Sequence, residues 1–394
     1  MQRFGEIKSI WRATTYETDY PRLKKDLKVD VVVIGGGMAG LSIAYSLTKQ
    51  GLKVAVLEGG RIASATSGNT TAKITSLHGL RYASLAKKFG LEKAQIYASS
   101  NQWAVEEIEY IIRKEEIDCD FYMAPAFTYT SSKAELQNII DELNMCLQLS
   151  LPASYEIKVD SAKIKVAGAV KFEDQAYFHP RKYLLKLAEI INESGGLIFE
   201  NSRALGVEER NGFCIVSAGE SKVTAKAAVV ATNFPFYDPD KIFVKLHRAG
   251  SFVIAATPAG DFADVMYIGT QGMDMSFRPH KDGDRRWLIV GARHDEKPGD
   301  NNLTESINLL VKLAKKNFQV KSIDYQWGAT DTMSSDNVPY IGLFPRRRNV
   351  YVATAFSAWG MTPSVVSAKL IGDLILGKKN DWESLYDPQR LLIS

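Results

Sequence analysis

The chain has 394 residues, which is too long for one ordinary domain and fits about two or three. Its 49 basic and 45 acidic residues give a net charge of +4 and are scattered, whereas nucleic-acid-binding proteins concentrate basic charge on one face. Cys119, Cys146 and Cys214 are the three cysteines, and they have neither a disulfide framework nor zinc or iron–sulfur spacing. The composition argues against nucleic-acid binding, and we expect no metal site.

The N-terminal segment, residues 1–28, is polar and aromatic, and we expect it to lie as an arm on the surface of a domain. It lacks the apolar run of a signal peptide, so a cytoplasmic location is the default expectation. Residues 31–47 carry no charge and resemble a membrane span in composition. Four glycines in this run favour a strand, a turn and a helix instead, so we predict no membrane span.

A strand–turn–helix–strand unit follows the arm. Residues 29–34 are a β-branched run typical of a buried parallel strand, and residues 38–50 have helical apolar spacing. Residues 35–40 match a G-x-G-x-x-G turn, which lets backbone approach a pyrophosphate and presents helix N–H groups to it. The second strand, residues 53–57, ends at Glu58, where an acid accepts hydrogen bonds from ribose hydroxyls. This unit predicts a bound dinucleotide.

FAD and NAD both bind to such units, and three later segments favour FAD. Residues 64–73 are small and polar, which suits a loop along an extended cofactor, although a low-complexity linker has the same composition. Residues 229–232 are a strand that ends in a small residue and a hydroxyl. Residues 356–363 place Gly360 at the start of a helix, whose N-terminus would stabilise negative charge on a reduced flavin. An NAD-dependent dehydrogenase is the weaker alternative because it needs no such late element.

The remaining apolar patterns alternate between helices and strands. Residues 82–116 are expected to form two helices, and Pro180 opens another that ends before Gly195. From residue 244 to residue 277 the pattern changes to alternating strands with turns. Further helices are expected at residues 133–147, 303–318 and 363–377, and strands at residues 121–130, 169–172, 197–199, 204–208, 213–217, 225–231, 287–291 and 350–353.

This order predicts an α/β fold. We expect a Rossmann-type FAD-binding domain with an inserted α+β substrate domain built on a mixed or antiparallel sheet. The first and last β–α units are alike in chemistry and the middle is not, so the FAD-binding domain is expected to be discontinuous. We assign residues 1–118, 176–241 and 330–394 to the FAD-binding domain and residues 119–175 and 242–329 to the substrate domain.

Five segments carry a further pattern: Ser9–Trp11, Asp30–Gly40, Ser67–Thr75, Asp336–Gly342 and Ala353–Thr362. With these segments the chain resembles the FAD-dependent oxidoreductases of the D-amino-acid oxidase (DAO) superfamily, which includes glycine and sarcosine oxidases. Within that superfamily it is most similar to the FAD part of bacterial oxidoreductases that carry a C-terminal Rieske iron–sulfur domain. The segments span nearly the whole chain, and the last three together are fairly specific.

The resemblance implies a place along FAD for each matched position. The ADP half would be bound by Gly35, Gly37, Met38, Ala39, Gly40, Glu58 and Gly59, and the adenine by the backbone of Val207. Arg61, Thr66 and Ser67 would lie along the pyrophosphate, Ala231 and Thr232 near the cofactor, and Asn69, Thr70, Thr71, Ala72 and Lys73 against the isoalloxazine. Gly360, Met361 and Thr362 would lie at the pyrimidine edge, where Trp359 would either wall the flavin or pack in the core.

Two departures from the family pattern bear on function. No cysteine has Rieske spacing, so electrons from a reduced flavin would pass to oxygen or to a separate carrier. Amino-acid oxidases tend to place an arginine shortly before the P-x-I-G stretch to hold the substrate carboxylate, but residues 327–333 contain none. Arg278 would replace it, because a guanidinium pairs bidentately with a carboxylate; the alternative is a solvated arginine at a strand end.

The candidate catalytic residues are Lys73, His78 and Arg278. Hydride removal from a C–N bond requires a neutral amine near flavin N5 and few other groups. Lys73 would bond near N5 or to a water, and His78 would orient substrate or form a covalent flavin link; surface or capping roles stay open for both. His179 precedes Pro180 and is interpreted as structural. We expect an oxidoreductase acting on an amine or amino acid, or alternatively a non-catalytic or electron-transferring flavoprotein subunit.

Overall fold

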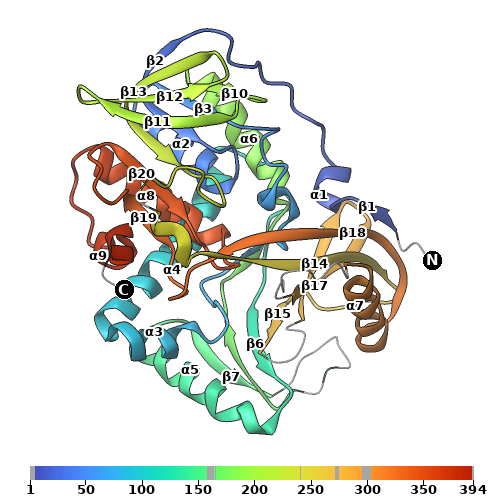
Figure 1. Ribbon diagram of the computed structural model, residues 1–394. Helices are drawn as coiled ribbons and strands as arrows, with labels where there is room; N and C mark the ends of the chain where they lie inside the picture. Colours follow the sequence, from blue (N-terminus) through green and yellow to red (C-terminus); the bar gives the residue numbers. More distant parts are fainter. Residues whose placement is uncertain are drawn as a thin grey trace.

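The computed structural model describes residues 5–157, 164, 166–239, 241–270, 275–294 and 303–392. Two large sheets and a small three-stranded sheet organise these residues, and helices pack on the sheets (Figure 1). The α/β class predicted from the sequence is confirmed. Within the described ranges, no helix is both long enough and apolar enough to cross a membrane.

The first sheet joins strands that lie far apart in the sequence. They are β2 (Leu27–Ile34), β3 (Val54–Leu57), β10 (Leu197–Phe199), β11 (Ala204–Arg210), β12 (Phe213–Ala218), β13 (Ser221–Val230), β19 (Tyr340–Leu343) and β20 (Val350–Thr354). Neighbours β10, β3, β2 and β13 run parallel, and β20 pairs parallel with the end of β13. β12 and β11 continue antiparallel from β13, and β19 pairs antiparallel with β20. The parallel centre explains why residues 29–34 are apolar without alternation.

Helices pack together on one face of this sheet. α2 (Met38–Lys49) lies between α6 (Pro180–Glu193) and α8 (Met361–Ile375), and α4 (Leu91–Lys114) packs on α8. α8 begins two residues earlier than predicted, with Pro363 in its first turn, where a missing N–H is tolerated. The other helices are α1 (Ile10–Ala13), α3 (Arg81–Phe89), α5 (Leu136–Gln148), α7 (Leu303–Asn317), α9 (Glu383–Tyr386) and the 3₁₀ turns η1 (Thr66–Asn69), η2 (Lys133–Glu135), η3 (Ile242–Lys245) and η4 (Pro388–Leu392).

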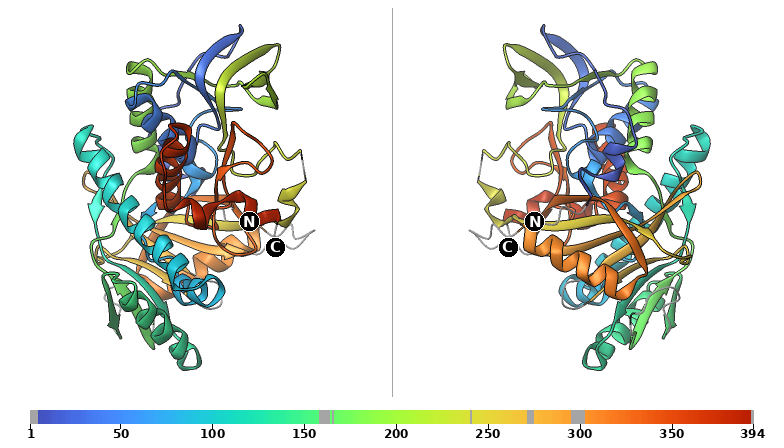
Figure 2. Two further views of the ribbon diagram at one scale, coloured as in Figure 1. Left: turned by 90° about the vertical axis from the view of Figure 1, so that its left-hand side faces the viewer. Right: turned by 90° about the vertical axis from the view of Figure 1, so that its right-hand side faces the viewer.

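The second sheet is mixed, which is one of the two arrangements predicted. In spatial order its strands are β1 (Glu6–Ile7), β18 (Val320–Met333), β14 (His247–Pro258), β17 (Arg285–His294), β16 (Ser276–Asp282), β15 (Met266–Gly269), β6 (Ala126–Thr130), β8 (Gly168–Phe172) and β7 (Ala153–Glu156). Most neighbours are antiparallel, but β1 pairs parallel with β18 and β15 pairs parallel with β6. Figure 2 shows the first sheet above the second, and the chain passes repeatedly between them.

One expectation about strands is wrong, and one long strand was not predicted. Residues 121–130 do not form one strand, because Pro125 separates β6 from β5 (Tyr122–Met123). β5 joins β9 (Ala176–Tyr177) and β4 (Lys73–Ile74) in the three-stranded sheet. The long strand β18 was not predicted, because its polar residues interrupt the alternation that marks a strand. β18 also runs through residue 330, where we place a domain boundary, and the domain division stays a prediction.

The N-terminal arm is not a surface segment throughout, which corrects a further expectation. Its short helix α1 buries Ile10 and Trp11 completely. The Trp11 indole N–H donates to the carbonyl of Thr70 at 2.7 Å, and its ring lies edge-on to His179 and His280 at 5.0 and 4.8 Å. A helix of one turn has too few residues for its buried face to show in the sequence.

Trp11→Ala is expected to lower the free energy of unfolding by about 3–5 kcal/mol, because it leaves a cavity and an unpaired carbonyl. Ile7→Ala is the matched control from the same arm, since Ile7 is 81% exposed, and it should stay within about 0.5 kcal/mol of wild type. Urea unfolding measures both. Equal effects of the two substitutions would contradict the buried position of Trp11.

Candidate functional site

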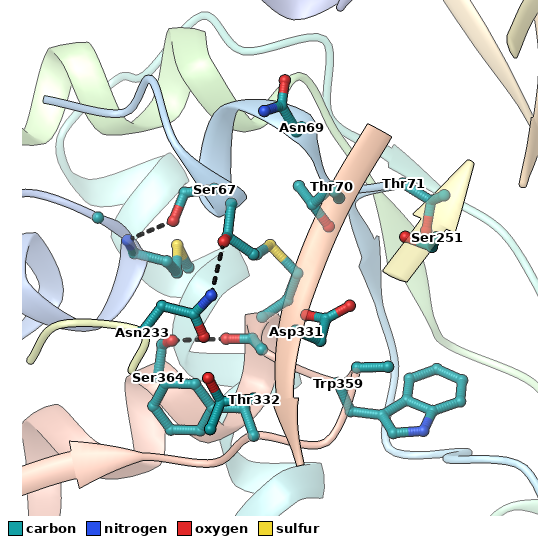
Figure 3. A pocket seen from close by; sticks show the side chains of 18 of the residues that line it. Ser67, Asn69, Thr70, Thr71, Asn233, Ser251, Asp331, Thr332, Trp359 and Ser364 are labelled. Atoms are coloured by element: carbon teal, nitrogen blue, oxygen red, sulfur yellow. Dashed lines mark hydrogen bonds between the residues drawn. The ribbon is translucent and has the colours of Figure 1, made fainter. Parts of the chain in front are cut away.

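A cavity of about 370 Å³ is lined by residues from both large sheets. This volume lies within the range of about 300–1,000 Å³ that is typical of small-molecule and cofactor pockets. One wall consists of the turn after β2, the loop around η1 and the start of α8. The opposite wall is one face of the second sheet. Figure 3 shows labelled side chains of both walls around the cavity.

The turn after β2 can have its shape only because it consists of glycines. A Cβ on Gly40 would lie 1.8 Å from the carbonyl oxygen of Gly35, so α2 can approach the strand only without a side chain there. Gly37 faces the cavity, where an added Cβ would lie 2.9 Å from Ser67 Oγ. That hydroxyl accepts the N–H of Met38 at 2.8 Å (Figure 3). The N-terminus of α2 therefore faces the cavity at Gly37, where no side chain covers the backbone. A helix N-terminus of this kind suits an anionic ligand.

The Glu58 carboxylate is fixed at the edge of the cavity by backbone N–H groups. Its Oε2 accepts from Gly36 at 2.8 Å and its Oε1 accepts from Gly60 at 2.7 Å. Each carboxylate oxygen keeps a further lone pair, so Glu58 can still accept hydrogen bonds from hydroxyl groups of a ligand. This is the position that the sequence predicts for a ribose-binding acid.

The loop between η1 and β4 is held by its backbone carbonyls. Side chains from the N-terminal arm, from β16 and from β18 each donate to one of four consecutive carbonyls. We call this set the loop clamp: Ser9 Oγ to Gly68, Trp327 Nε1 to Asn69, Trp11 Nε1 to Thr70 and Arg278 Nε to Thr71. The clamp fixes the backbone of the loop, and the side chains of Asn69, Thr70, Thr71 and Lys73 then line the cavity.

The opposite wall is a row of residues that lie side by side because they are register partners on neighbouring strands. Ile268, Ser276, Gly291 and Val253 are successive partners across β15, β16, β17 and β14, and all four line the cavity. A Cβ on Gly291 would lie 3.2 Å from a methyl group of Thr71, so the two walls approach each other closely there.

Lys73 lies where the two walls meet. It is 8% exposed, it lines the cavity, and its Nζ donates to Ser276 Oγ on β16. Burial, and to a lesser extent the charge of Arg278, together lower the pKa of the Lys73 amine to about 7. Lys73 can therefore be neutral or protonated near neutral pH.

His78 also lines the cavity, but both of its ring nitrogens have partners. Nε2 lies 2.8 Å from the carbonyl of Thr75, which can only accept, so Nε2 carries the proton and Nδ1 accepts from Tyr97 O–H at 2.7 Å. Burial lowers the pKa of His78 to about 3, which keeps the ring neutral. Trp359 stacks on this ring at 4.6 Å. His78 therefore positions Trp359 at the cavity and has no nitrogen free to react.

The start of α8 completes the wall on the side of the first sheet. Gly360, Met361 and Thr362 line the cavity at the helix N-terminus, and Thr362 Oγ1 lies 3.0 Å from Asn101 Oδ1. Residues 355–358 before the helix include Ala355, Ser357 and Ala358 with φ of 59°, 52° and 68°. Non-glycine residues in the left-handed region are uncommon and cluster at functional sites.

Some predicted residues lie outside the cavity lining. Arg61 instead pairs with Asp19 at 3.0 Å and with the buried Glu200 at 2.7 Å, and so ties the N-terminal arm to the end of β10. Ala72 is fully buried with φ of 56°, and Val207 lies on β11. The predicted residues absent from the lining are Gly40, Gly59, Arg61, Ala72, Val207 and Arg278.

Arg278 is neither a solvated strand end nor a cavity residue. Its guanidinium is fully buried and donates to the carbonyls of Thr71, Pro279 and Phe178. The ring centroids of Trp11 and Tyr177 lie 5.0 and 4.9 Å from it. The expectation that Arg278 holds a substrate carboxylate is therefore wrong for this geometry, because the guanidinium is fully buried and lies outside the cavity lining.

Other lining residues were not predicted as site residues. Asn233 directly follows the predicted Thr232, so its neighbour was a usable signal. Ala65, Phe356 and Ala358 lie within the segments 64–73 and 356–363 that the sequence singled out. Most of the others face the cavity through strand register and loop packing, which a single sequence does not reveal. The set is Ala65, Thr75, Asn233, Ser251, Val253, Ile268, Ser276, Gly291, Ala292, Ala329, Asp331, Thr332, Phe356, Ala358 and Ser364. Among the residues with described positions, no cluster of histidine, cysteine or carboxylate ligands has the form of a metal site.

The chain matches the model of the FAD dependent oxidoreductase family, DAO, over residues 30–374. YhfW of Bacillus subtilis, named as a Rieske 2Fe-2S iron–sulfur protein, is 31% identical over 97% of this chain and 75% of its own length. Gamma-glutamylputrescine oxidoreductase of Escherichia coli is 25% identical over 91% of this chain and 86% of its own. The structure of glycine oxidase from Geobacillus kaustophilus is similar with a TM-score of 0.78 at 15% identity, covering 92% of this chain and 99% of that one.

Gly37→Ala is expected to weaken FAD binding at least about 10-fold, because the added Cβ enters the space where backbone must approach the cofactor. Gly206→Ala is the control, since a Cβ there meets nothing within 4 Å. The ratio of flavin to protein after purification, followed by titration with FAD, gives the affinity. Retention of full affinity by Gly37→Ala would show that this turn does not contact the cofactor.

Proposed function

The chain belongs to the FAD-dependent oxidoreductase family, and on that premise we propose that it oxidises a C–N bond of an amine or amino acid. FAD, when bound, supplies the hydride acceptor at N5 of its isoalloxazine ring. The residues of the chain bind both molecules, exclude water and handle the proton.

The observation that carries this proposal is the continuous cavity with two unlike walls. The wall from the first sheet offers bare backbone and the N-termini of α2 and α8, which suit an extended anionic cofactor. The wall from the second sheet offers mostly small side chains, among them the hydroxyls of Ser251 and Ser276, together with the carboxylate of Asp331, and the amine of Lys73 lies at the junction. This arrangement suits a small organic substrate held against the cofactor.

The residues of the first wall fit FAD. Thr232 Oγ1 is buried at this wall without a hydrogen-bond partner among the described residues, and a bound cofactor would satisfy it. The α2 N-terminus at Gly37 would hold the pyrophosphate and Glu58 the ribose. Residues 66–73 would follow the cofactor, and the start of α8 at Gly360 would meet the pyrimidine edge.

The relatives favour a C–N substrate. Gamma-glutamylputrescine oxidoreductase and several glycine oxidases are named for an amine or an amino acid, and both types match most of this chain. The cavity favours an amine over an amino acid, because Arg278, the one arginine proposed for a carboxylate, is fully buried and does not line the cavity. The electron acceptor in this proposal is oxygen or a separate carrier.

The purified protein is expected to be yellow and to lose its flavin absorption when an amine substrate is added without oxygen. A screen of primary amines, N-methyl amines and amino acids, read by absorbance, identifies the substrate. Bleaching by an electron-carrier protein but by no C–N compound would favour the alternative, an electron-transferring flavoprotein subunit. A protein that takes up no flavin on reconstitution would refute the proposal.

Lys73→Met is expected to slow anaerobic bleaching by about 10²-fold or more while flavin stays bound, because it removes the proton-transferring group at the junction of the walls. The wild-type rate should rise with pH through an apparent pKa near 7, as Lys73 becomes neutral, and the variant should lose this rise. Lys379→Met changes an exposed lysine and serves as control. A variant with the wild-type rate and pH profile would exclude Lys73 from the chemistry.

A further inference from the structure

Arg278 is a buried cation whose surroundings contain no carboxylate partner. Its charge is met by three backbone carbonyls and by the faces of Trp11 and Tyr177. No carboxylate of the described residues forms an ion pair with it within 4.0 Å. Carbonyl dipoles and aromatic rings stabilise a cation without neutralising it. The positive charge therefore remains effective on groups nearby, in a region where water does not screen it.

This charge lies directly behind the cavity wall. Ser276 and Arg278 are two residues apart on β16, so both point to the same face of the sheet. Ser276 reaches the cavity and bonds Lys73, whereas Arg278 is covered by the loop at Thr71 and bonds its carbonyl. The loop backbone thus separates the fixed guanidinium from the Lys73 amine.

The groups packed around Lys73 leave Arg278 as the dominant charge. Burial and Arg278 are the two causes that lower the pKa of Lys73. The nearby imidazoles are neutral, because burial lowers the pKa of His179 to about 3 and that of His280 to about 2. The other titratable or charged groups on the elements that pack here are Tyr177 on β9, Tyr122 on β5, Lys281 and Asp282 on β16, Asp264, Asp120 with Lys182, His78, and the carboxylates of Glu58 and Asp331 in the same cavity lining.

We propose that Arg278 is a positioning residue for the reaction: it anchors the loop before Lys73 and keeps the Lys73 amine neutral, so that this amine takes a proton from the substrate's ammonium group. This inference rests on the proposed oxidation of an amine. The N–H bond of the substrate ammonium breaks and an Nζ–H bond forms on Lys73. The substrate is left as a neutral amine with the lone pair that hydride loss requires, and Lys73 carries the positive charge.

The transfer is feasible because both nitrogens share one environment. An ammonium group bound beside Lys73 is also desolvated and also lies near Arg278, so its own pKa falls toward that of Lys73. A bound flavin that had accepted the hydride would carry negative charge. A protonated Lys73 beside it would then be favourable. Arg278 thus acts through Lys73 and does not touch the substrate.

The test is trace labelling of lysines with acetic anhydride in the purified flavoprotein from pH 6 to pH 11, read by peptide mass spectrometry. In wild type, Lys73 should reach half-maximal labelling near pH 7, and the labelling of the exposed Lys379 in the same samples is the internal reference. Half-maximal labelling of Lys73 above about pH 9.5, or no labelling of Lys73 at any pH, would overturn the proposal. This readout needs no substrate and no turnover.

Two Arg278 variants separate charge from anchoring. Arg278→Gln removes the charge but keeps a donor for Thr71, and it should move half-maximal labelling of Lys73 upward by about one pH unit or more. Arg278→Lys keeps a cation and should stay near wild type. Arg181→Gln is the control, because Arg181 is equally buried but bonds Thr15, Tyr16 and Glu17 away from the cavity. An unchanged labelling profile in Arg278→Gln would overturn the role of its charge.

The two proposals fail in different ways. If C–N compounds never bleach the flavin, the proposed function fails even when Lys73 labels near pH 7. If bleaching occurs but Lys73 labels like Lys379, the function stands and the role of Arg278 falls. If Arg278→Gln does not fold, the labelling profile of Lys73 in wild type and the pH dependence of bleaching in Arg278→Lys still test the proposed role of Arg278.

Discussion

The site depends on one constraint: four consecutive carbonyls of the loop before β4 must find donors inside the protein. Buried carbonyls without partners are costly, and residues 64–73 are too small to cover their own backbone. The loop clamp meets this need with Ser9 and Trp11 from the N-terminal arm, Arg278 from β16 and Trp327 from β18. These bonds fix the loop to the N-terminal arm and to β16 and β18 of the second sheet, and so link the two walls of the cavity.

The clamp also decides which charges reach the cavity. The guanidinium of Arg278 is fully buried outside the cavity lining, where it does not meet a substrate carboxylate, and its charge acts on Lys73 from behind the loop. His78 is likewise held by Thr75 and Tyr97 and contributes a neutral ring under Trp359. Of the three candidate catalytic residues, Lys73 alone keeps an amine at the junction of the walls.

The part of the site on the first sheet depends on contacts between residues that lie close together in the sequence. The approach of Gly40 to the carbonyl of Gly35 requires a residue without a Cβ, and both positions lie within one turn of sequence. The same holds for Glu58, which bonds N–H groups of Gly36 and Gly60 close to it along the chain or across one strand pair. Local requirements of this kind leave a readable pattern, and the predicted Gly35, Gly37 and Glu58 accordingly lie at the cavity, whereas Arg61 and Val207 lie outside its lining.

The sequence by itself determined the α/β class, the glycine turn, the acid at Glu58, the small-residue loop and the helix after Gly360, because each depends on backbone shape or on neighbours within a few residues. Only the tertiary structure decided that Trp11 is buried, that Ser276 and Gly291 face the cavity, and that Arg278 lies behind it. These positions result from strand register and from donors that meet carbonyls more than fifty residues away in the chain. Such pairings depend on the whole packed chain, and no local pattern of residues encodes them.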